Sequence, residues 1–507
     1  MGALPRSNRR LLPVVATAVV AAVCLTLAGC GGSAVDPKTA ARAQRVDGLT
    51  LPSSQGAGTD QSSGTGSTTG TGTGSTTTTG TGGGTGTTTG GGTGSTTGGS
   101  SSGGGGTTTT GGGGGGGSTG GGTAPGAKPA VSCAGFKNGP GITATTMRIG
   151  NASDINGPVP GLFLATQQAV RAYVAYFNAS GSTICGRKLV LDTYDSRTDA
   201  GGDQQAYVQG CSNDFAMVGS MSAFDSGGAA TAQGCGIPDI RAIATTTERG
   251  SCGTCYAIQA AGPTSFENAV PDFIIKHTGG QHAAMLYVNL GASAVNGQSQ
   301  VKLETKRGMK FVSVQPVDVA AFNYGPYVQN MRSAGVDSIQ FIASSAQFAR
   351  LGQAMAQAGF KPKLYILDPS AYNPDYTSQG GATSIGTVVF LNFTPFEEAA
   401  SNPEESLYLR WLQQVSPGAK PTFFGVFAWS AARLFVEEAT RLGGSLTRSS
   451  LLTATSKVDN WTDNGMHAPQ HVGSKKVADC WRFIQWSGSV WKPIDGSQYH
   501  CNGVTNG

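Results

Sequence analysis

The chain has 507 residues, of which 79 are glycine, and a formal net charge of +5 at pH 7. Of its 34 Lys and Arg and its 29 Asp and Glu, seven and three lie in residues 1–130, which leaves 27 against 26 for residues 131–507. A part of the chain this close to neutral lacks the basic surface on which nucleic-acid binding depends. We therefore expect no nucleic-acid partner.

The chain opens with the features of an export signal. Three arginines precede the apolar run "LLPVVATAVVAAVCLTLAGC" at 11–30, the order of regions found in signal peptides. A membrane-spanning helix is the alternative for a run of this length, but Pro13 and the final "LAGC" count against it. "LAGC" resembles the lipobox of bacterial lipoproteins. The resemblance implies a signal peptide 1–29 and lipid on Cys30, which would hold the protein on the outer face of the cell membrane.

A string built almost wholly from Gly, Ser and Thr extends from about Gly56 to Gly126. Such residues bury no apolar surface that could offset the entropy of ordering them, so we expect a coil. A Gly-rich coil of about 70 residues has an r.m.s. reach of roughly 45–50 Å. We assign residues 30–130 to the lipid anchor and a disordered linker, and residues 131–507 to the folded part.

Eight cysteines follow Cys30, and an even set in an exported chain predicts up to four disulfides. Eight cysteines allow 105 pairings, and we expect only Cys480–Cys501, because the residues between them are predicted to form two strands and a turn. The "CGTC" at 252–255 is either a redox motif or a loop disulfide. Its place between a polar stretch and a strand favours the disulfide. The candidates are Cys133, Cys185, Cys211, Cys235, Cys252, Cys255, Cys480 and Cys501.

Strands and helices alternate from about Met147 onward. Strands are predicted at 147–153, 188–195, 215–220, 237–240, 282–290, 309–317, 338–344, 363–368 and 385–393. Helices are predicted at 161–181, 200–210, 226–234, 267–280, 297–308, 324–335 and 346–359. This alternation predicts parallel sheets with helices on both faces, and about 360 residues exceed one core, so two α/β lobes are expected.

Five segments resemble the type I periplasmic-binding fold of branched-chain amino-acid-type substrate-binding proteins, which serve ABC importers. They are "ASDINGPVPG" (152–161), "FNASGSTICGRKLVLDTYDSRTDAGG" (177–202), "FAMVGSMSAFDSGGAATAQGCGIPDIRAIATTT" (215–247), "FNYGPYVQNMRSAGVDSIQF" (322–341) and "AMAQAGFKPKLYILDP" (354–369). The resemblance covers nearly all of residues 146–495. No single segment is diagnostic, and the specificity comes from all five segments occurring in the family's order.

The resemblance implies an α/β fold of two doubly wound parallel-sheet lobes that are joined by a three-crossing hinge. The crossings would lie near Gly262, Phe393 and 461–466. Lobe one would comprise about 146–261 plus 394–462, and lobe two about 263–392 plus 463–507. It further implies a monomer without cofactor, metal or catalytic residues, which closes on a small molecule and passes it to an ABC permease.

The first candidate ligand loop is "GSMSAFDSGG" at 219–228. Backbone N–H groups at a helix N-terminus, with Ser220, Ser222 and Ala223, favour an anion such as a carboxylate. The alternative is ordinary capping, in which Ser222 or Asp225 bonds the helix's own first N–H groups.

The second candidate loop is "IATTTERG" at 243–250, where the resemblance assigns ligand hydrogen bonds to Thr245 or Thr246. A threonine run is also common at an exposed strand end. Further candidates across the cleft are Asp154, Asn289, Asp368 and Tyr372.

The chain departs from the family's amino-acid binders at two places. They tend to carry an aromatic residue after the "LYV" strand, where this chain has "NLGASAVNG". They also carry a carboxylate after the "LYIL" strand, whereas Asp368 is shifted and precedes Pro369. These departures count against an amino acid, and a small polar or anionic metabolite is equally compatible.

Two other functions remain open. A secreted hydrolase finds little support, because residues 131–507 hold no GxSxG, HExxH or P-loop motif. The pairs His467/His471 and His277/His282 are expected to be surface or loop histidines rather than metal ligands. "FEEAASNPEE" at 396–405 is expected to start a helix. A cell-envelope sensor of the same fold is the closer alternative, and a neighbouring permease gene would separate transport from sensing.

Overall fold

The computed structural model describes residues 132–507. The predicted signal peptide, Cys30 and the Gly/Ser/Thr-rich linker lie outside the described residues. Residues 132–507 contain no helix with the length and apolarity that a bilayer crossing needs.

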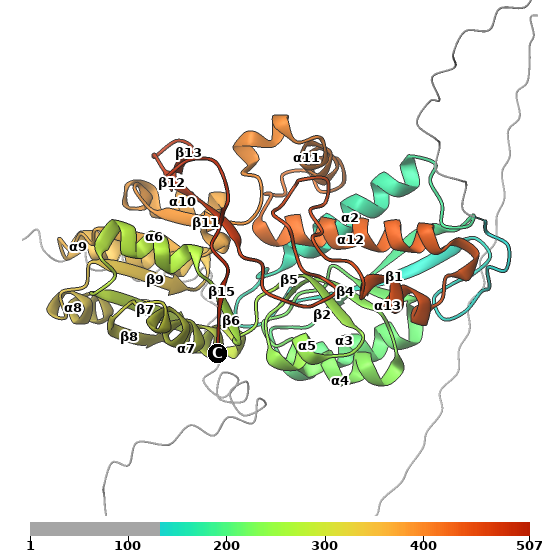
Figure 1. Ribbon diagram of the computed structural model, residues 1–507, viewed down its shortest axis with the longest axis horizontal. Coiled ribbons are helices and arrows are strands. Elements are labelled where there is room, and N and C mark those ends of the chain that lie inside the picture. The colour runs from blue at the N-terminus through green and yellow to red at the C-terminus, as the bar shows by residue number, and fades with distance from the viewer. Residues whose placement is uncertain (1–131) are drawn as a thin grey trace, which may run out of the picture. The chain divides into compact units, whose positions relative to one another are not determined.

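The first sheet is wholly parallel, with the strand order β2-β1-β3-β4-β5 (Figure 1). Its strands are β1 (Thr146–Ser153), β2 (Lys188–Asp195), β3 (Ala216–Val218), β4 (Asp239–Ala244) and β5 (Cys255–Ala260). The helices between them are α2 (Leu164–Ala179), α3 (Ala200–Asn213), α4 (Ser226–Cys235) and α5 (Thr247–Ser251). β3 and β4 are buried along their whole length, as central strands covered on both faces must be.

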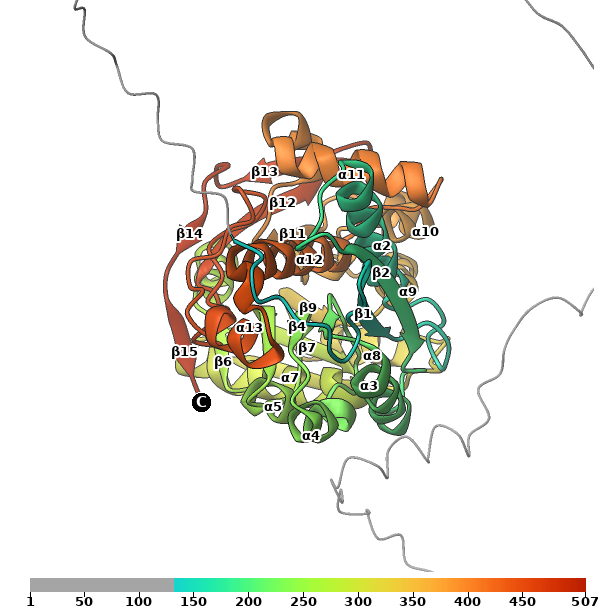
Figure 2. The same ribbon diagram turned by 90° about the vertical axis from the view of Figure 1, so that its right-hand side faces the viewer.

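Three later helices complete this lobe, namely α11 (Pro403–Val415), α12 (Phe423–Leu442) and α13 (Arg448–Thr455). α12 packs against α2 and β4 (Figure 2). It starts at Thr422, whose side chain accepts from the backbone N–H of Gly425, and it buries Trp429 completely. The expected helix start near "FEEAASNPEE" is present as the short 3-10 helix η3 (Phe396–Ser401) followed by α11.

The second sheet has the order β13-β12-β11-β10-β9-β7-β8, and β14 pairs with β12. Five parallel strands are β7 (Ala283–Val288), β8 (Phe311–Val317), β9 (Ser338–Ile342), β10 (Leu364–Leu367) and β11 (Val388–Leu391). The antiparallel ones are β12 (Cys480–Trp486), β13 (Trp491–Ile494) and β14 (His500–Cys501). The helices are α6 (Ala269–Thr278), α7 (Gly291–Lys306), α8 (Gly325–Ser333), α9 (Ser345–Gln357) and α10 (Pro374–Gly380), with the 3-10 turns η1 (Pro369–Ala371) and η2 (Gly381–Ser384). The predicted α/β class with two parallel sheets is confirmed.

The chain passes from one lobe to the other three times: between β5 and β6 (Ser265–Glu267), between β11 and η3, and between α13 and β12. These three segments contain the crossing points expected near Gly262, Phe393 and 461–466. The exact lobe boundaries stay a prediction. The last strand, β15 (Val504–Asn506), pairs antiparallel with β6, and both views show the two side by side (Figures 1 and 2).

All eight cysteines are paired, as Cys133–Cys185, Cys211–Cys235, Cys252–Cys255 and Cys480–Cys501. The one expected pair, Cys480–Cys501, is confirmed, since β12 and β14 bring these residues opposite each other. Cys252–Cys255 joins the end of α5 to β5. The motif thus follows a helix and precedes a strand, the reverse of the order in a thioredoxin-like unit.

Candidate functional site

A cavity of about 490 Å³ lies between the two lobes. The first lobe contributes the segment before α2, the loop after β3, the ends of β4 and β5, and the start of α12. The second lobe contributes β6, α7, the loops after β9 and β10, and parts of β11 and β12. Clefts at the carboxyl ends of parallel strands are the usual ligand sites of such sheets.

The lobes touch each other at the edge of this cavity. The backbone N–H of Ala292 donates to the carbonyl oxygen of Ala223 at 3.0 Å. The Asn296 side-chain amide donates to the carbonyl oxygens of Thr245 and Ala261, both at 3.2 Å. Because Ala292 and Asn296 belong to the second lobe and their acceptors to the first lobe or the hinge, these hydrogen bonds join the two lobes at this edge of the cavity.

α7 begins at Gly291, earlier than the predicted start at residue 297. The first N–H groups of a helix need acceptors from elsewhere, and here the first lobe supplies one through Ala223. This contact depends on the fold and is invisible in the local sequence. It also places Ser293, expected in a loop, within the helix.

Asp154 accepts four hydrogen bonds in the first lobe and is fully buried. The donors are Ser196 Oγ (2.6 Å), the Thr198 N–H (3.0 Å), Ser222 Oγ (3.0 Å) and the Ala223 N–H (2.8 Å). Burial raises the pKa of this carboxyl group, and the four hydrogen bonds oppose the rise. The side chain of Asp154 therefore occupies the Ser222 hydroxyl and the Ala223 N–H, which the sequence analysis expected to bind a ligand anion.

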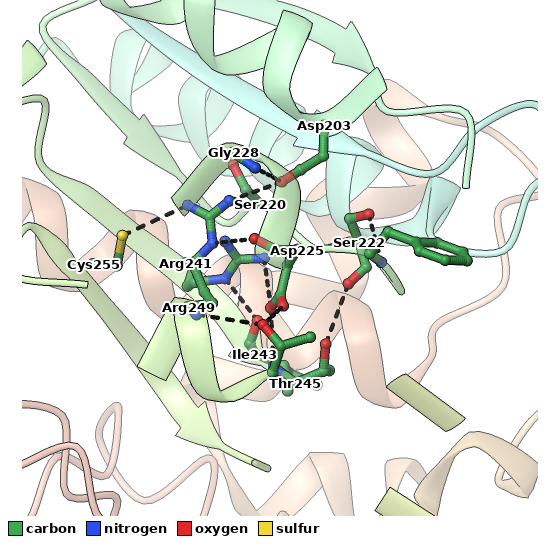
Figure 3. Close-up of polar contacts among 12 residues, drawn as sticks. Asp203, Ser220, Ser222, Asp225, Gly228, Arg241, Ile243, Thr245, Arg249 and Cys255 are labelled. Atoms are coloured by element: carbon green, nitrogen blue, oxygen red, sulfur yellow. Dashed lines mark hydrogen bonds and ion pairs between the residues drawn. The ribbon is translucent and has the colours of Figure 1, made fainter. Parts of the chain in front are cut away.

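A buried ion cluster holds the second candidate loop (Figure 3). Asp225 Oδ2 accepts from the Thr245 N–H at 2.9 Å and lies 3.3 Å from Arg241 Nη2, while Asp225 Oδ1 accepts from Thr246 Oγ1 at 2.6 Å. Asp239 Oδ2 bonds Arg241 at 3.1 Å and Arg249 at 3.0 Å. Since these groups are almost fully buried, the loop is fixed by charge-assisted hydrogen bonds before any ligand arrives.

The cluster contains a third acid, Asp203, which pairs with Arg249 at 2.8 Å. Three acids thus face two arginines. Burial raises the pKa of Asp203 to about 6, and the charges of Arg249 and Arg241 oppose the rise.

Three of the nine predicted ligand residues line the cavity: Ala223, Thr245 and Asp368. Asp368 accepts from the Ser370 N–H at 2.8 Å, and burial raises its pKa to about 6. The other six are Asp154, Ser220, Ser222, Thr246, Asn289 and Tyr372, and none of them is part of the cavity wall.

Among the described residues, five of these six have side-chain partners within the protein, and Asn289 is bonded through its backbone. Ser220 Oγ accepts from the Ala152 N–H at 3.1 Å, and Ser222 Oγ accepts from the Phe224 N–H at 3.1 Å. Phe224 lies in the turn before α4, and α4 has no side-chain cap, so neither Ser222 nor Asp225 caps this helix as the alternative expected. Asn289 donates its backbone N–H to Val317, and Tyr372 Oη bonds Glu397 and accepts from the Phe396 N–H. A direct ligand role for them stays a prediction.

The cavity walls are largely apolar, a property that the polar loops in the sequence do not indicate. Phe163 and Phe424 meet edge to face at 4.9 Å between ring centroids, and Phe423 packs against Phe424 at 5.3 Å. All three line the cavity together with Leu162, Met221, Ile243, Val288 and Leu290. The "FF" directly after the helix cap Thr422 is a sequence signal, but only the packing of α12 onto the first lobe shows where the rings lie.

A polar stripe of α7 was also missed. Its cavity-lining residues recur at helical spacing: Ala292, Ser293, Asn296, Ser299, Gln300 and Leu303. No Lys, Arg or His of the described residues lines the cavity, whereas the acids Glu267, Asp368 and Asp375 do. Among residues 132–507, no group of three or more His, Cys, Asp or Glu is placed to hold a metal. His467 is a buried loop histidine, 2% exposed, with Nε2 at 2.8 Å from Ser430 Oγ.

The family model described as periplasmic binding protein matches residues 146–489, more than half of the chain. The chain belongs to the periplasmic binding protein family. The comparison with curated proteins finds no match.

Solved structures share the fold of this family member at low identity. A fatty acid ABC transporter substrate-binding protein from Thermomonospora curvata is 18% identical, with a TM-score of 0.60 over 72% of this chain and 95% of that one. A leucine-binding protein from Thermotoga maritima is 16% identical, with a TM-score of 0.57 over 71% and 99%. A solute-binding protein from R. palustris, solved in complex with 4-hydroxybenzoate, is 16% identical, with a TM-score of 0.57 over 70% and 97%.

Proposed function

We propose that the chain captures a small solute between its two lobes outside the cytoplasm, leaves it chemically unchanged and delivers it to an ABC importer. The observation that carries this proposal is the cavity of about 490 Å³ whose wall comes from both lobes, closed at its edge by the Ala292–Ala223 hydrogen bond. A site divided between two lobes couples binding to closure, which a permease can sense. The family and the substrate-binding proteins named above support transport.

The cavity favours an amphiphilic solute over the small polar metabolite expected from the loops. Asp154 occupies the Ser222 and Ala223 donors, and the described cavity wall offers no cationic side chain to an anion. The aromatic wall of Phe163, Phe423 and Phe424 suits an apolar body. Hydrogen-bonding groups of the solute would meet Thr245, Asn296 and Gln300.

We also propose that Cys30 carries the lipid anchor and that residues 30–130 serve as the tether. Lipid chains contribute roughly 0.8 kcal/mol per buried methylene, so two or more chains would hold the protein stably. A tether of this length still keeps the binding domain at an appreciable effective concentration near a permease.

Thermal-shift screening of the purified chain against fractionated metabolite extracts tests solute capture. A solute at 100 times its dissociation constant adds about 2.7 kcal/mol to the free energy of unfolding. F424A should reduce that shift, because its ring lines the cavity. F322A is the matched control, because Phe322 lies outside the cavity wall and is 77% exposed. The proposal fails if no fraction shifts the unfolding midpoint, or if the bound compound is recovered chemically altered.

A further inference from the structure

Glu267 is a buried carboxyl group in the cavity wall, and the hydrogen bond that acts on it comes from its own backbone. It sits on β6, lines the cavity and is 5% exposed. Its backbone is held by the ladder to Val504 of β15. Among the described residues, no other residue donates a hydrogen bond to its side chain and no cation pairs with it. An ionised carboxylate buried in this way is costly unless a positive charge comes to it.

The charged neighbour that acts on Glu267 is a second acid, Glu304 of α7. Glu304 is fully buried and accepts from Gln300 Nε2 at 3.0 Å and from Gln340 Nε2 at 2.6 Å. The side-chain amides of Gln300 and Gln340 therefore satisfy the carboxyl group of Glu304. Negative charge on Glu304 repels negative charge on Glu267. Burial and Glu304 raise the pKa of Glu267 to about 8.

Aromatic rings and an oriented amide line the same cavity as Glu267. Phe390 and Trp481 lie edge to face at 5.3 Å, and both line the cavity with Leu303. Gln300 lines it as well, fixed by its bonds to Glu304 and to Gln340 Oε1 at 2.8 Å. A cavity that offers both a carboxylate and aromatic rings can recognise an organic cation by ion pairing and by cation–π attraction. We refer to Glu267, Gln300, Leu303, Phe390 and Trp481 as the Glu267 wall.

We infer that the solute carries a basic nitrogen, an ammonium or amidinium on an apolar body, and that this cation pairs with Glu267 while the body packs against Phe163, Phe423 and Phe424. The inference rests on the proposed function and names its substrate class. The two features that support it are independent: the Glu267 wall combines one carboxyl group with two aromatic rings, and the cavity lacks a Lys, Arg or His among the described residues that could serve an anion.

Three compounds with one apolar body and different ends test this inference: 4-phenylbutylamine, 4-phenylbutan-1-ol and 4-phenylbutanoate. Calorimetric titration of the full chain at about pH 9, where Glu267 is ionised, should give the amine a dissociation constant at least about tenfold below those of the alcohol and the acid. Binding of the amine at about pH 7.5 should release a proton from Glu267, seen as a dependence of the heat on the buffer's ionisation enthalpy.

E267Q keeps the shape of the side chain and removes its charge. It should cost the amine about tenfold in affinity and leave the alcohol unchanged. E248Q is the matched control, since Glu248 is exposed and outside the cavity. An acid or alcohol that binds the wild-type chain as tightly as the amine overturns the inference, whatever the fate of the variant. So does an amine that fails to bind, or an amine affinity unchanged in a folded E267Q.

The thermal-shift measurement distinguishes failure of the basic-nitrogen inference from failure of the proposed function. If the inference alone is wrong, metabolite extracts still stabilise the chain, and the stabilising compound lacks a basic nitrogen. If the proposed function is wrong, no extract stabilises the wild-type chain at all.

Discussion

The backbone N–H of Ala292 donates a 3.0 Å hydrogen bond to the carbonyl oxygen of Ala223, so a helix of the second lobe is capped by a loop of the first. Gly291 makes this approach possible. Its φ is +49°, and a Cβ built on it would lie 2.8 Å from the same carbonyl oxygen and 3.0 Å from Cζ of Phe224. Closure of the lobes therefore depends on a position where a side chain has no room.

G291A should hinder closure without unfolding either lobe. We expect solute affinity to fall about tenfold or more, because the closed state that binds the solute becomes less populated. Small-angle scattering should show a larger radius of gyration in the presence of solute than for wild type.

The matched control is G335A. Gly335 also has a positive φ, +66°, but nothing lies within 4 Å of its added Cβ, so this variant carries the backbone strain alone. Equal losses of affinity in the two variants would show that strain, and not contact between the lobes, causes the effect.

D154N should destabilise the first lobe. The amide keeps one acceptor but turns a donor toward either the Ala223 N–H or the Thr198 N–H, and neither backbone group can accept, so at least one buried donor is left unsatisfied. We expect a loss of about 1–3 kcal/mol in the free energy of unfolding, measured by urea titration. D318N, at an aspartate whose side chain accepts from the Ala320 N–H near the surface, should cost much less. Equal stability of D154N and wild type would contradict the assigned role of Asp154.

Glu405 should make the stability of the chain depend on pH. It is buried, neither carboxyl oxygen has a hydrogen-bond partner, and burial together with Glu398 and Glu397 raises its pKa to about 9. The folded chain thus binds a proton that the unfolded chain releases above its ordinary pKa of about 4.3. Its contribution to stability is complete below that value and is lost as the pH rises through about 9.

E405Q should therefore gain stability over wild type as the pH increases. Between about pH 5 and 8 the difference should grow by about 1–3 kcal/mol, followed by denaturant titration at each pH. E248Q removes an exposed carboxylate and should show no such trend. A difference between E405Q and wild type that is constant with pH would mean that Glu405 titrates normally in the folded chain.

A structural feature can be predicted from the sequence when the residues that form it lie close together in the chain. The alternation of strands and helices from β1 to β11 follows from local periodicity, and Cys480–Cys501 follows from a hairpin that brings its two ends together. The capture of Ser222 and Ala223 by Asp154 joins residues 68 and 69 positions apart in the chain. Such contacts, like the early start of α7, form only when the strands pack into the folded sheet. No local sequence pattern therefore predicts them.

The pair C480S/C501S should loosen the strand that carries Glu267. The disulfide spans 21 positions, for which chain entropy alone predicts a loss of about 3 kcal/mol. It anchors the segment that continues into β15, and β15 pairs with β6. We expect faster amide exchange at Ser265–Glu267 and weaker binding of the amine probe.

C211S/C235S is the matched control, because that disulfide spans 24 positions but joins α3 to α4 in the other lobe. It should cost similar stability and leave the exchange of β6 unchanged. Faster exchange at β6 in both variants would point to a general loss of stability instead.

Asp154 accepts the hydrogen bonds of the Ser222 hydroxyl and the Ala223 N–H in the first lobe. These loop donors are therefore satisfied whether or not a ligand is bound. A homologue that takes up carboxylic acids through these donors would have to give up its aspartate before it could use them. Specificity for anions on this scaffold would thus begin with the removal of an acid, and a cationic residue need never be acquired.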